Sequence, residues 1–268
     1  MCSIIKMRFI GFVSFAAYLA VACSVHAASL PSAQDDGRYP TLNKMGWAIN
    51  SIDPYTQEFI NFAAQVQRPV LEIGAAYGFA THATLKANAV VIANDLEPKH
   101  LQILQDITAK ELRDKLILMP GRFPEELHFT ENSLGAILVS RVFHFFDDQE
   151  LELAAATLYK WLMVGGKAYI ITESTYLKPW QKFISVYEAR KKANNPWPGL
   201  LKEPAKYNSK SAAQLPKYIH FMDPDILSRV FTKVGFKVEK VGFISRTDFP
   251  LEVQLDGRES VGIIVVKE

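Results

Sequence analysis

Short apolar runs alternate with longer segments of helical periodicity along most of the chain. Five of the runs have the length and aliphatic content of strands that are buried on both faces of a parallel sheet: 70–73, 89–93, 116–119, 134–139 and 168–172. Three segments between them have the apolar spacing of crossover helices: 79–86, 98–112 and 148–163. The glycines at 165–166 are expected to end the last of these helices. This alternation predicts a doubly wound α/β domain with a mostly parallel sheet.

Further elements are predicted on both sides of this alternating region. A helix is expected from Asp53 to about Val66, because an N-cap residue is followed by proline at the first helical position. The same signal begins a helix at Asp223. The last two apolar runs, 236–243 and 262–267, have the pattern of strands. The chain is therefore expected to end with two strands after its last helix.

The stretch from Val70 to Thr81 carries the first chemical signal. Glu72 stands near the end of a buried strand, where a purely structural strand favours another aliphatic residue. Gly74 and Gly78 follow, separated by alanines and a tyrosine, and a helix-compatible segment begins directly after them. Backbone without a Cβ can approach a ligand closely, and open parallel sheets bind ligands at the carboxyl ends of their strands. This stretch predicts a ligand site; the alternative is a tight connection with only a structural purpose.

Asp95 closes the second strand of the predicted sheet. An acid at this place in a βαβ unit can accept hydrogen bonds from both hydroxyls of a ribose. The alternative is that Asp95 only caps the helix that begins near Pro98. Together, the glycine turn and the acid predict a ligand that contains a nucleoside.

The segment Glu72–Gly78 (EIGAAYG) resembles the first motif of class I S-adenosylmethionine-dependent methyltransferases, an acid followed by G-x-G-x-G, with Ala76 in place of the middle glycine. Asp95 matches the ribose acid of that family, and the last two strands are similar to its terminal antiparallel hairpin. The resemblance implies a seven-stranded, mostly parallel Rossmann-like sheet with that hairpin, and an enzyme whose cofactor is S-adenosyl-L-methionine. A dinucleotide oxidoreductase is disfavoured, because the G-x-G-x-x-G spacing is absent and an acid precedes the first glycine.

The resemblance also implies a set of cofactor contacts: Glu72, Gly74, Ala75, Ala76, Gly78, Asp95, Leu96, Arg122, Phe123 and Ser140. Arg122 departs from the family, most of which has an acid at this place to bind the adenine amino group. A backbone group, or stacking on Phe123, would then serve the adenine instead.

The segment after the fourth strand, Ser140 to His144, resembles the region of the family that lies between cofactor and acceptor. Arg141 and His144 are therefore expected near the reacting methyl group, and we take them as candidate catalytic residues. A histidine there can act as general base for a hydroxyl acceptor. The alternative is a histidine that only packs under the loop.

Strand and helix alternation lapses between Ser174 and Phe221, where aromatic residues are mixed with nine lysines and arginines. Only Glu188 and Glu203 oppose them, which leaves this segment with a net charge of +7, against +2 for the whole chain. We expect an inserted lid over the acceptor site, helical from about 179 to 193. A small-molecule acceptor is the favoured partner. The charge also suits nucleic acid, an acidic partner, a membrane face, or only solvent.

The first 27 residues have the three parts of a secretory signal peptide: Lys6 and Arg8, an apolar run from Phe9 to about Val25, and a small-x-small pattern that ends at Ala27. An uncleaved membrane anchor is the alternative. Both cysteines lie in this segment, so the mature chain is expected to have no disulfide and no thiolate metal site. The leader predicts an exported protein, periplasmic or secreted, whereas the expected cofactor is made in the cytosol. A cytoplasmic or membrane-anchored enzyme is the other interpretation.

The chain divides on this basis into a leader at 1–27, a linker and N-terminal flap at 28–52, and a methyltransferase domain at 53–268 that contains the lid at 174–221. Its 268 residues suit one α/β domain. The favoured function is methyl transfer to a small molecule. The alternatives are methyl transfer to RNA or protein, and a degenerate relative that binds a ligand without catalysis. The sequence has no metal-ligand cluster, G-x-S-x-G turn or phosphate loop, which disfavours hydrolases and nucleoside triphosphatases.

The cleavage pattern predicts a mature N-terminus at Ala28. When the full chain is expressed in a bacterium with a general secretory system, we expect mass spectrometry to find this residue first in the exported protein. The Ala27→Lys variant should accumulate as precursor, because signal peptidase needs a small residue there. An intact N-terminus on cytosolic wild-type protein would contradict the interpretation as a leader.

Overall fold

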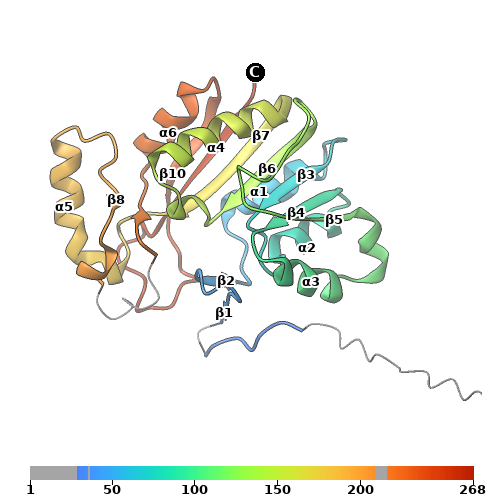
Figure 1. Ribbon diagram of the computed structural model, residues 1–268, viewed down its shortest axis with the longest axis horizontal. Coiled ribbons are helices and arrows are strands. Elements are labelled where there is room, and N and C mark those ends of the chain that lie inside the picture. Colours follow the sequence, from blue (N-terminus) through green and yellow to red (C-terminus); the bar gives the residue numbers. More distant parts are fainter. Residues whose placement is uncertain (1–28, 36, 209–215) are drawn as a thin grey trace, which may run out of the picture.

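The computed structural model describes residues 29–35, 37–208 and 216–268; the predicted leader lies outside the described residues. The main sheet has seven strands in the spatial order β10-β11-β7-β6-β3-β4-β5 (Figure 1). Their bounds are β3 Val70–Ile73, β4 Val91–Asp95, β5 Leu116–Pro120, β6 Leu134–Ser140, β7 Leu162–Glu173, β10 Lys237–Ile244 and β11 Ser260–Val266.

Strand pairing is parallel in one part of the sheet and antiparallel in the other. β3 pairs in parallel with β4 and β6, β4 with β5, and β6 with β7. β11 runs antiparallel to both β7 and β10. The predicted fold, a doubly wound and mostly parallel sheet that ends in an antiparallel hairpin, is confirmed.

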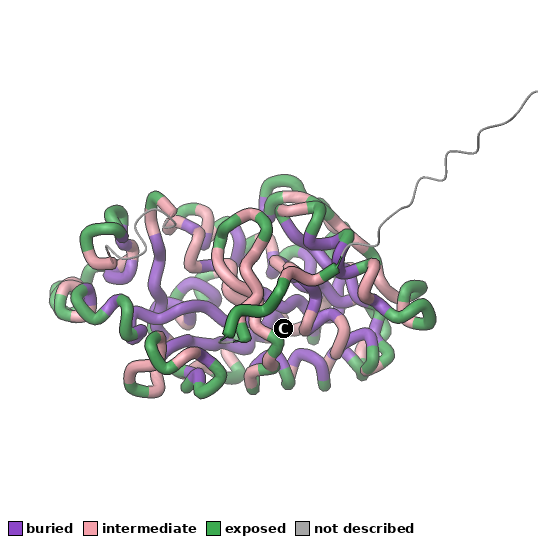
Figure 2. Tube along the Cα trace, turned by 90° about the horizontal axis from the view of Figure 1, so that it is seen from below, coloured by how far each residue is buried: buried purple, intermediate pink, exposed green. Residues whose placement is uncertain are grey.

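Helices cover both faces of this sheet. Their bounds are α1 Pro54–Ala63, α2 Phe79–Lys86, α3 Pro98–Ile107, α4 Asp148–Trp161 and α6 Pro224–Lys233. The first three pack on one face, and α4 and α6 pack on the other. Because strand side chains alternate, Val70 packs with α1 whereas its neighbour Leu71 packs in the cluster of α4 and α6. Figure 2 shows the resulting buried interior between exposed turns.

The boundary between α4 and β7 differs from the prediction. The helix ends at Trp161, and Gly165 and Gly166 lie inside the strand rather than at the end of the helix. The N–H of Gly165 donates to the carbonyl of Lys267 (2.7 Å), and the N–H of Lys267 donates to the carbonyl of Gly166 (3.0 Å). Pairing with the end of the chain extends the strand, and the local sequence pattern does not contain that partner.

Two other elements differ from the sequence-based expectation. The helix expected over 98–112 ends at Ile107 and is followed by a 3₁₀ helix, η1 (Lys110–Lys115). The stretch expected as a linker and flap contains an antiparallel hairpin, which we call the N-terminal hairpin, formed by β1 (Arg38–Pro40) and β2 (Trp47–Ile49).

The segment 174–221 packs mainly around a core of its own, with α5 at one end of the view in Figure 1. Its elements are η3 Lys178–Trp180, α5 Gln181–Lys192, β8 Leu200–Leu201, η4 Pro204–Lys206 and β9 Ile219–His220. Phe183 and Tyr187 of α5 are almost completely buried in this core. Across the described part of the chain, no helix combines the length and apolarity that a membrane span requires.

The start of α4 offers a direct test of the capping signal. The side chain of Asp147 accepts from the N–H of Glu150, and the Glu150 side chain accepts from the N–H of Asp147, both at 2.9 Å. We expect Asp147→Ala to lower the free energy of unfolding by about 1 kcal/mol, because helix N–H groups lose their acceptor. Urea denaturation would measure this. Gln149→Ala, an exposed position in the same turn, should have almost no effect; equal losses would contradict the capping role.

Candidate functional site

A cavity lies at the carboxyl ends of β3, β4 and β6, where open parallel sheets bind ligands. Nine of the ten expected cofactor residues line it: Glu72, Gly74, Ala75, Ala76, Asp95, Leu96, Arg122, Phe123 and Ser140. Residues of the N-terminal hairpin and the segment after it complete the wall, among them Thr41, Met45, Trp47, Ile49, Ser51 and Asp53. Glu72 and Asp95 therefore face the same cavity, as one ligand held by both would require.

The glycines of the turn after β3 are required by conformation and by packing. Gly74 and Gly78 have φ values of +74° and +76°, in the left-handed region that favours glycine. A Cβ on Gly74 would overlap the side chain of Val142, and one on Gly78 would overlap Leu104. Gly78 is the expected cofactor residue that does not line the cavity. Its missing side chain makes room for α3 instead of a ligand.

Ala76 takes the place of the middle glycine in this turn, and its φ is +47°. An alanine in the left-handed region is strained, so something must hold it there. Its N–H donates to Oδ2 of Asp95 at 2.8 Å. The substitution is therefore accommodated by a hydrogen bond to the second predicted site residue.

The carboxyl group of Glu72 is buried beneath the turn. The Thr81 hydroxyl, from the first turns of α2, donates to Oε2 of Glu72. Burial raises the pKa of Glu72 to about 7, hydrogen bonds from Thr81 oppose that rise, and the charge of Asp95 adds to it. Near neutral pH this group can exchange a proton, and a cation that bound beside it would favour the ionised form.

Asp95 is hydrogen-bonded at both oxygens. Oδ1 accepts from the N–H of Glu97 (2.8 Å) and from Nδ1 of His100 (3.0 Å), while Oδ2 accepts from Ala76. A carboxylate has about four acceptor positions. The three bonds within the protein leave about one for a ligand, rather than one for each ribose hydroxyl as the sequence suggested. The residue that caps α3 is Glu97, whose side chain accepts from the N–H of Lys99, so Asp95 holds the capping residue and does not cap the helix itself.

His100 connects Asp95 to the N-terminal hairpin. This histidine is buried, and its Nε2 accepts from the N–H of Leu42 at 2.9 Å. Because Nε2 is an acceptor, the ring proton lies on Nδ1, which donates to Asp95. The expected ribose acid is thus oriented by a histidine whose own partner is the loop of the hairpin.

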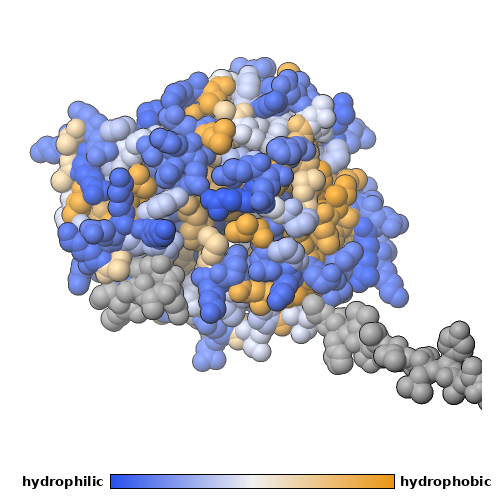
Figure 3. Space-filling model, in the orientation of Figure 1, coloured by the Kyte–Doolittle hydropathy of each residue, from blue (hydrophilic) through white to orange (hydrophobic). Residues whose placement is uncertain are grey.

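Other contacts attach the N-terminal hairpin around the cavity. The hydroxyl of Tyr77 donates to the carbonyl of Pro40 at 2.6 Å, and the rings of Tyr39 and Phe79 lie 5.2 Å apart. In the space-filling view of Figure 3, apolar atoms gather in the lower middle of the molecule, the region of β2 in Figure 1. The hairpin thus packs on the residues that form the glycine turn.

The residues after β5 border the cavity, but their side chains contact other residues of the protein. Nη2 of Arg122 donates to Oε1 of Glu150 (2.9 Å), and its Nε lies 3.5 Å from Oε2 of Glu125. Phe123 is buried, with its ring stacked 6.1 Å from that of Phe146. Arg122 is therefore directed to acids outside the turn, while an apolar ring and backbone remain at this end of the cavity.

The candidate catalytic residues are placed differently from one another. Arg141 lines the cavity; its Nε donates to Oε1 of Glu173 (2.9 Å) and its Nη1 to the carbonyl of Trp47 (3.3 Å). His144 does not line it. It lies in η2 (Phe143–Phe145), Nδ1 is buried without a hydrogen-bond partner among the described residues, and burial lowers its pKa to about 4.

His144 therefore fits the alternative of a histidine packed under the loop better than that of a general base. A side chain that does not reach the cavity surface is not within hydrogen-bond range of an acceptor bound there.

The expected lid, segment 174–221, is not seen at the cavity among the described residues. No described residue of 174–221 lines the cavity, because the aromatic side chains of that segment are used in its own core. The N-terminal hairpin contributes the covering residues instead.

Among the cavity residues that sequence reasoning missed, His100 and Arg246 have polar side-chain contacts of consequence for the site. His100 is a buried polar residue on the apolar side of α3, a pattern that calls for a partner. Arg246 follows the end of β10 and is two residues before Asp248, which marks it as a candidate ion pair at the same edge of the sheet.

Residues 70–166 match a protein family described as a methyltransferase domain. This part of the chain is therefore similar to a methyltransferase domain, as the residues Glu72–Gly78 and Asp95 predicted, and S-adenosylmethionine is the cofactor that the similarity implies. The match covers the glycine turn, Asp95 and the segment of Arg141, which are the residues that build most of the cavity. Among curated protein sequences, none matches the chain.

Solved structures show the same fold at low sequence identity. The chain is similar to the glycopeptide N-methyltransferase MtfA in complex with S-adenosylmethionine, with 16% identity, a TM-score of 0.54, and coverage of 80% of this chain and 92% of that one. It is also similar to an S-adenosylmethionine-dependent methyltransferase from Mesorhizobium loti, with 15% identity, a TM-score of 0.57, and coverage of 80% and 96%.

The raised pKa of Glu72 predicts how stability depends on pH. Its carboxyl group binds a proton near pH 7 in the folded protein but near 4.5 in the unfolded chain, so the folded state holds the extra proton between these values. Stability of the wild type should therefore fall as pH rises across this window, and Glu72→Gln should escape that fall. We expect the stability of the variant relative to wild type to rise by about 2 kcal/mol between pH 5 and pH 8.

Urea denaturation at the two pH values would measure the difference. Glu131→Gln is the matched control, because Glu131 is exposed, and its relative stability should not change. A relative stability of Glu72→Gln that is the same at both pH values would contradict the shifted pKa.

Proposed function

We propose that this chain is an S-adenosylmethionine-dependent methyltransferase and that it acts on a small molecule bound in the cavity beneath the N-terminal hairpin. The observation that carries the proposal is the composition of the wall: Trp47, Ile49 and Ser51 close it from the N-terminal side. The basic segment 174–221 contributes none of its described residues there. An acceptor must reach the methyl group within a cavity whose wall the N-terminal hairpin completes, which favours a small molecule over a polymer.

The two halves of the cavity suit the cofactor and an acceptor respectively. Asp95 and the apolar ring of Phe123 suit the adenosine, whereas Glu72 and the turn after β3 suit the cationic methionine portion. When bound, the cofactor supplies a methyl group on a sulfonium, which is reactive without help from the protein. Binding both molecules side by side is then the main task of the protein, and positioning alone can lower a barrier by about 7–11 kcal/mol.

The other half of the cavity is lined by Ser140, Arg141, Phe145 and Arg246. The ion pair between Arg141 and Glu173 spans the ends of β6 and β7 and holds the loop after β6 in place. We assign Arg141 a positioning role in orienting the acceptor, in place of a role in proton transfer.

A polymer acceptor held by segment 174–221 is less favoured, because part of its charge is used internally. Lys191 pairs with Asp223 (2.5 Å) and Asp225 (2.9 Å). Arg190 donates to the carbonyls of Pro198 (3.3 Å) and Leu200 (3.0 Å). These cations hold the segment to α6 and to its own loops.

The proposal is tested by following the methyl label. Purified enzyme is incubated with methyl-tritiated S-adenosylmethionine and an extract of the source cells, and the products are separated by size. We expect tritium in the fraction below about 1 kDa, and none added to RNA or protein, since the N-terminal hairpin restricts access to the cavity. Label that stays with the polymer fraction and is released by nuclease or protease would refute the small-molecule acceptor.

Asp95→Ala provides the matched negative control. It removes an acceptor of the cavity together with the bonds to Ala76 and His100, so calorimetry should show loss of S-adenosylmethionine binding and the assay should show no transfer. Glu72→Ala should behave in the same way, whereas Glu131→Ala, an exposed site, should bind as wild type. Unchanged cofactor affinity in Asp95→Ala would refute the assignment of the site.

A further inference from the structure

Arg246 is a buried cation at the acceptor side of the cavity. It lies two residues beyond the end of β10, is only 4% exposed, and lines the cavity. Its Nη1 has no hydrogen-bond partner among the described residues. A buried N–H group without an acceptor is costly, and one beside a ligand cavity is available to a ligand.

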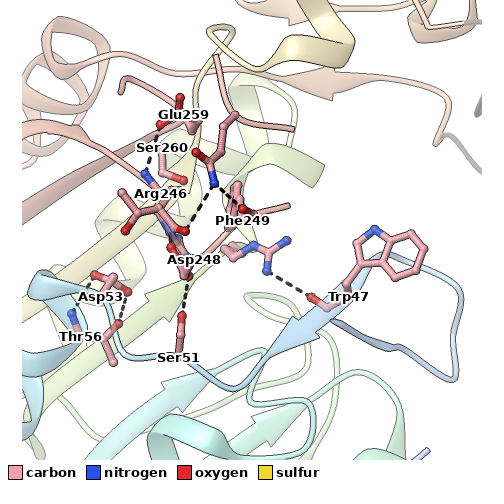
Figure 4. A network of polar contacts seen from close by, with 12 residues as sticks. Trp47, Ser51, Asp53, Thr56, Arg246, Asp248, Phe249, Glu259 and Ser260 are labelled. Atoms are coloured by element: carbon pink, nitrogen blue, oxygen red, sulfur yellow. Dashed lines mark hydrogen bonds and ion pairs between the residues drawn. The ribbon is translucent and has the colours of Figure 1, made fainter. Parts of the chain in front are cut away.

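The rest of the guanidinium is held rigidly. Nε donates to Oδ1 of Asp248 (2.9 Å) and Nη2 to Oδ2 (2.7 Å), and the guanidinium carbon lies 4.2 Å from the centre of the Phe249 ring. Asp248 also accepts from the hydroxyl of Ser51 (Figure 4). Nη1 therefore has a fixed position before any ligand binds, between the N-terminal segment and the C-terminal loop.

The nearby acidic groups are already used. Asp248 forms a two-bond ion pair with Arg246, and Asp53 caps α1 by accepting from the N–H groups of Tyr55 and Thr56 and from the Thr56 hydroxyl. A ligand oxygen is left as the natural partner of Nη1. A carboxylate makes the strongest such bond with a guanidinium, because the hydrogen bond is reinforced by charge.

The place of Arg246 in the sheet indicates which molecule brings this carboxylate. Its strand, β10, is five inter-strand spacings from β4, the strand of Asp95, which corresponds to about 24 Å in a sheet. The cofactor is anchored at β3 and β4, whereas Arg246 lies beyond β6 and β7. The acceptor is therefore the favoured source, and the cofactor's own methionine carboxylate is the other one.

We propose that Nη1 of Arg246 receives a carboxylate of the acceptor, so that the substrate is a small carboxylic acid. This rests on the proposed small-molecule function. Asp248, through its two bonds, is the positioning residue for this contact.

Two calorimetric titrations distinguish the sources of the carboxylate. In the first, S-adenosylhomocysteine and 5′-methylthioadenosine, which lacks the amino-acid portion, are bound to wild type and to Arg246→Met. In the second, acetate and benzoate are compared with acetamide and benzamide on protein saturated with S-adenosylhomocysteine. Arg258→Met is the matched control, since Arg258 makes the same kind of two-bond pair with Asp256 but does not line the cavity.

We expect the dissociation constants of Arg246→Met for both nucleosides to lie within twofold of the wild-type values. Its dissociation constant for at least one of the two carboxylates should be at least tenfold higher than that of wild type. Arg258→Met should have wild-type dissociation constants for all of these ligands. The amides should not distinguish the proteins. If Arg246→Met does not fold, Arg246→Lys replaces it, because it keeps the charge beside Asp248 but lacks Nη1.

Two results would overturn the proposal. A tenfold loss of S-adenosylhomocysteine affinity with unchanged 5′-methylthioadenosine affinity would assign Arg246 to the cofactor. Absence of carboxylate binding to wild type, or equal binding to Arg246→Met, would remove the subsite altogether. Neither result would contradict the proposed methyltransferase function. That proposal fails only if the wild-type protein does not bind the nucleosides or transfers no label.

Discussion

The carboxylate of Asp95 is the contact on which the organisation of the site depends. It accepts from Ala76 in the glycine turn, from Glu97 at the start of α3, and from His100, whose other nitrogen accepts from the hairpin residue Leu42. Three segments that are separate in sequence, namely the loop of the N-terminal hairpin, the glycine turn and the residues from Asp95 to His100, are therefore joined through one buried acid. A buried carboxylate is stable only when its oxygens are hydrogen-bonded, so these segments must come together for the acid to be tolerated.

The opposite side of the cavity is built in the same manner from two arginines. Arg141 joins the end of β7, through Glu173, to the carbonyl of Trp47 in the N-terminal hairpin. Arg246, through Asp248, joins the C-terminal loop to Ser51. Trp47 and Ser51 are thus hydrogen-bonded, respectively, to Arg141 and to Asp248. This side of the cavity wall therefore depends on these contacts and not on the described residues of the basic segment 174–221.

Prediction from sequence succeeded where the signal is local. Strand length, the left-handed glycines and the N-cap residues act within a few positions of themselves, so β3, α2 and the turn between them were predicted with their bounds. It failed where a partner lies far along the chain. Gly165 and Gly166 belong to a strand because Lys267 pairs with them, and His144 turned out not to line the cavity that Arg141 borders.

The sequence by itself determined the doubly wound fold, the glycine turn and the acids Glu72 and Asp95, because hydrophobic periodicity and turn propensity depend on residues that are close together in the sequence. Only the tertiary structure decided which element covers the cavity and which cations line it. Trp47, Ser51 and Arg246 are far apart in the sequence, and no local pattern predicts that they line one cavity. Their meeting depends on tertiary contacts, because Arg246 holds Asp248, and Asp248 accepts from the hydroxyl of Ser51 just after the N-terminal hairpin.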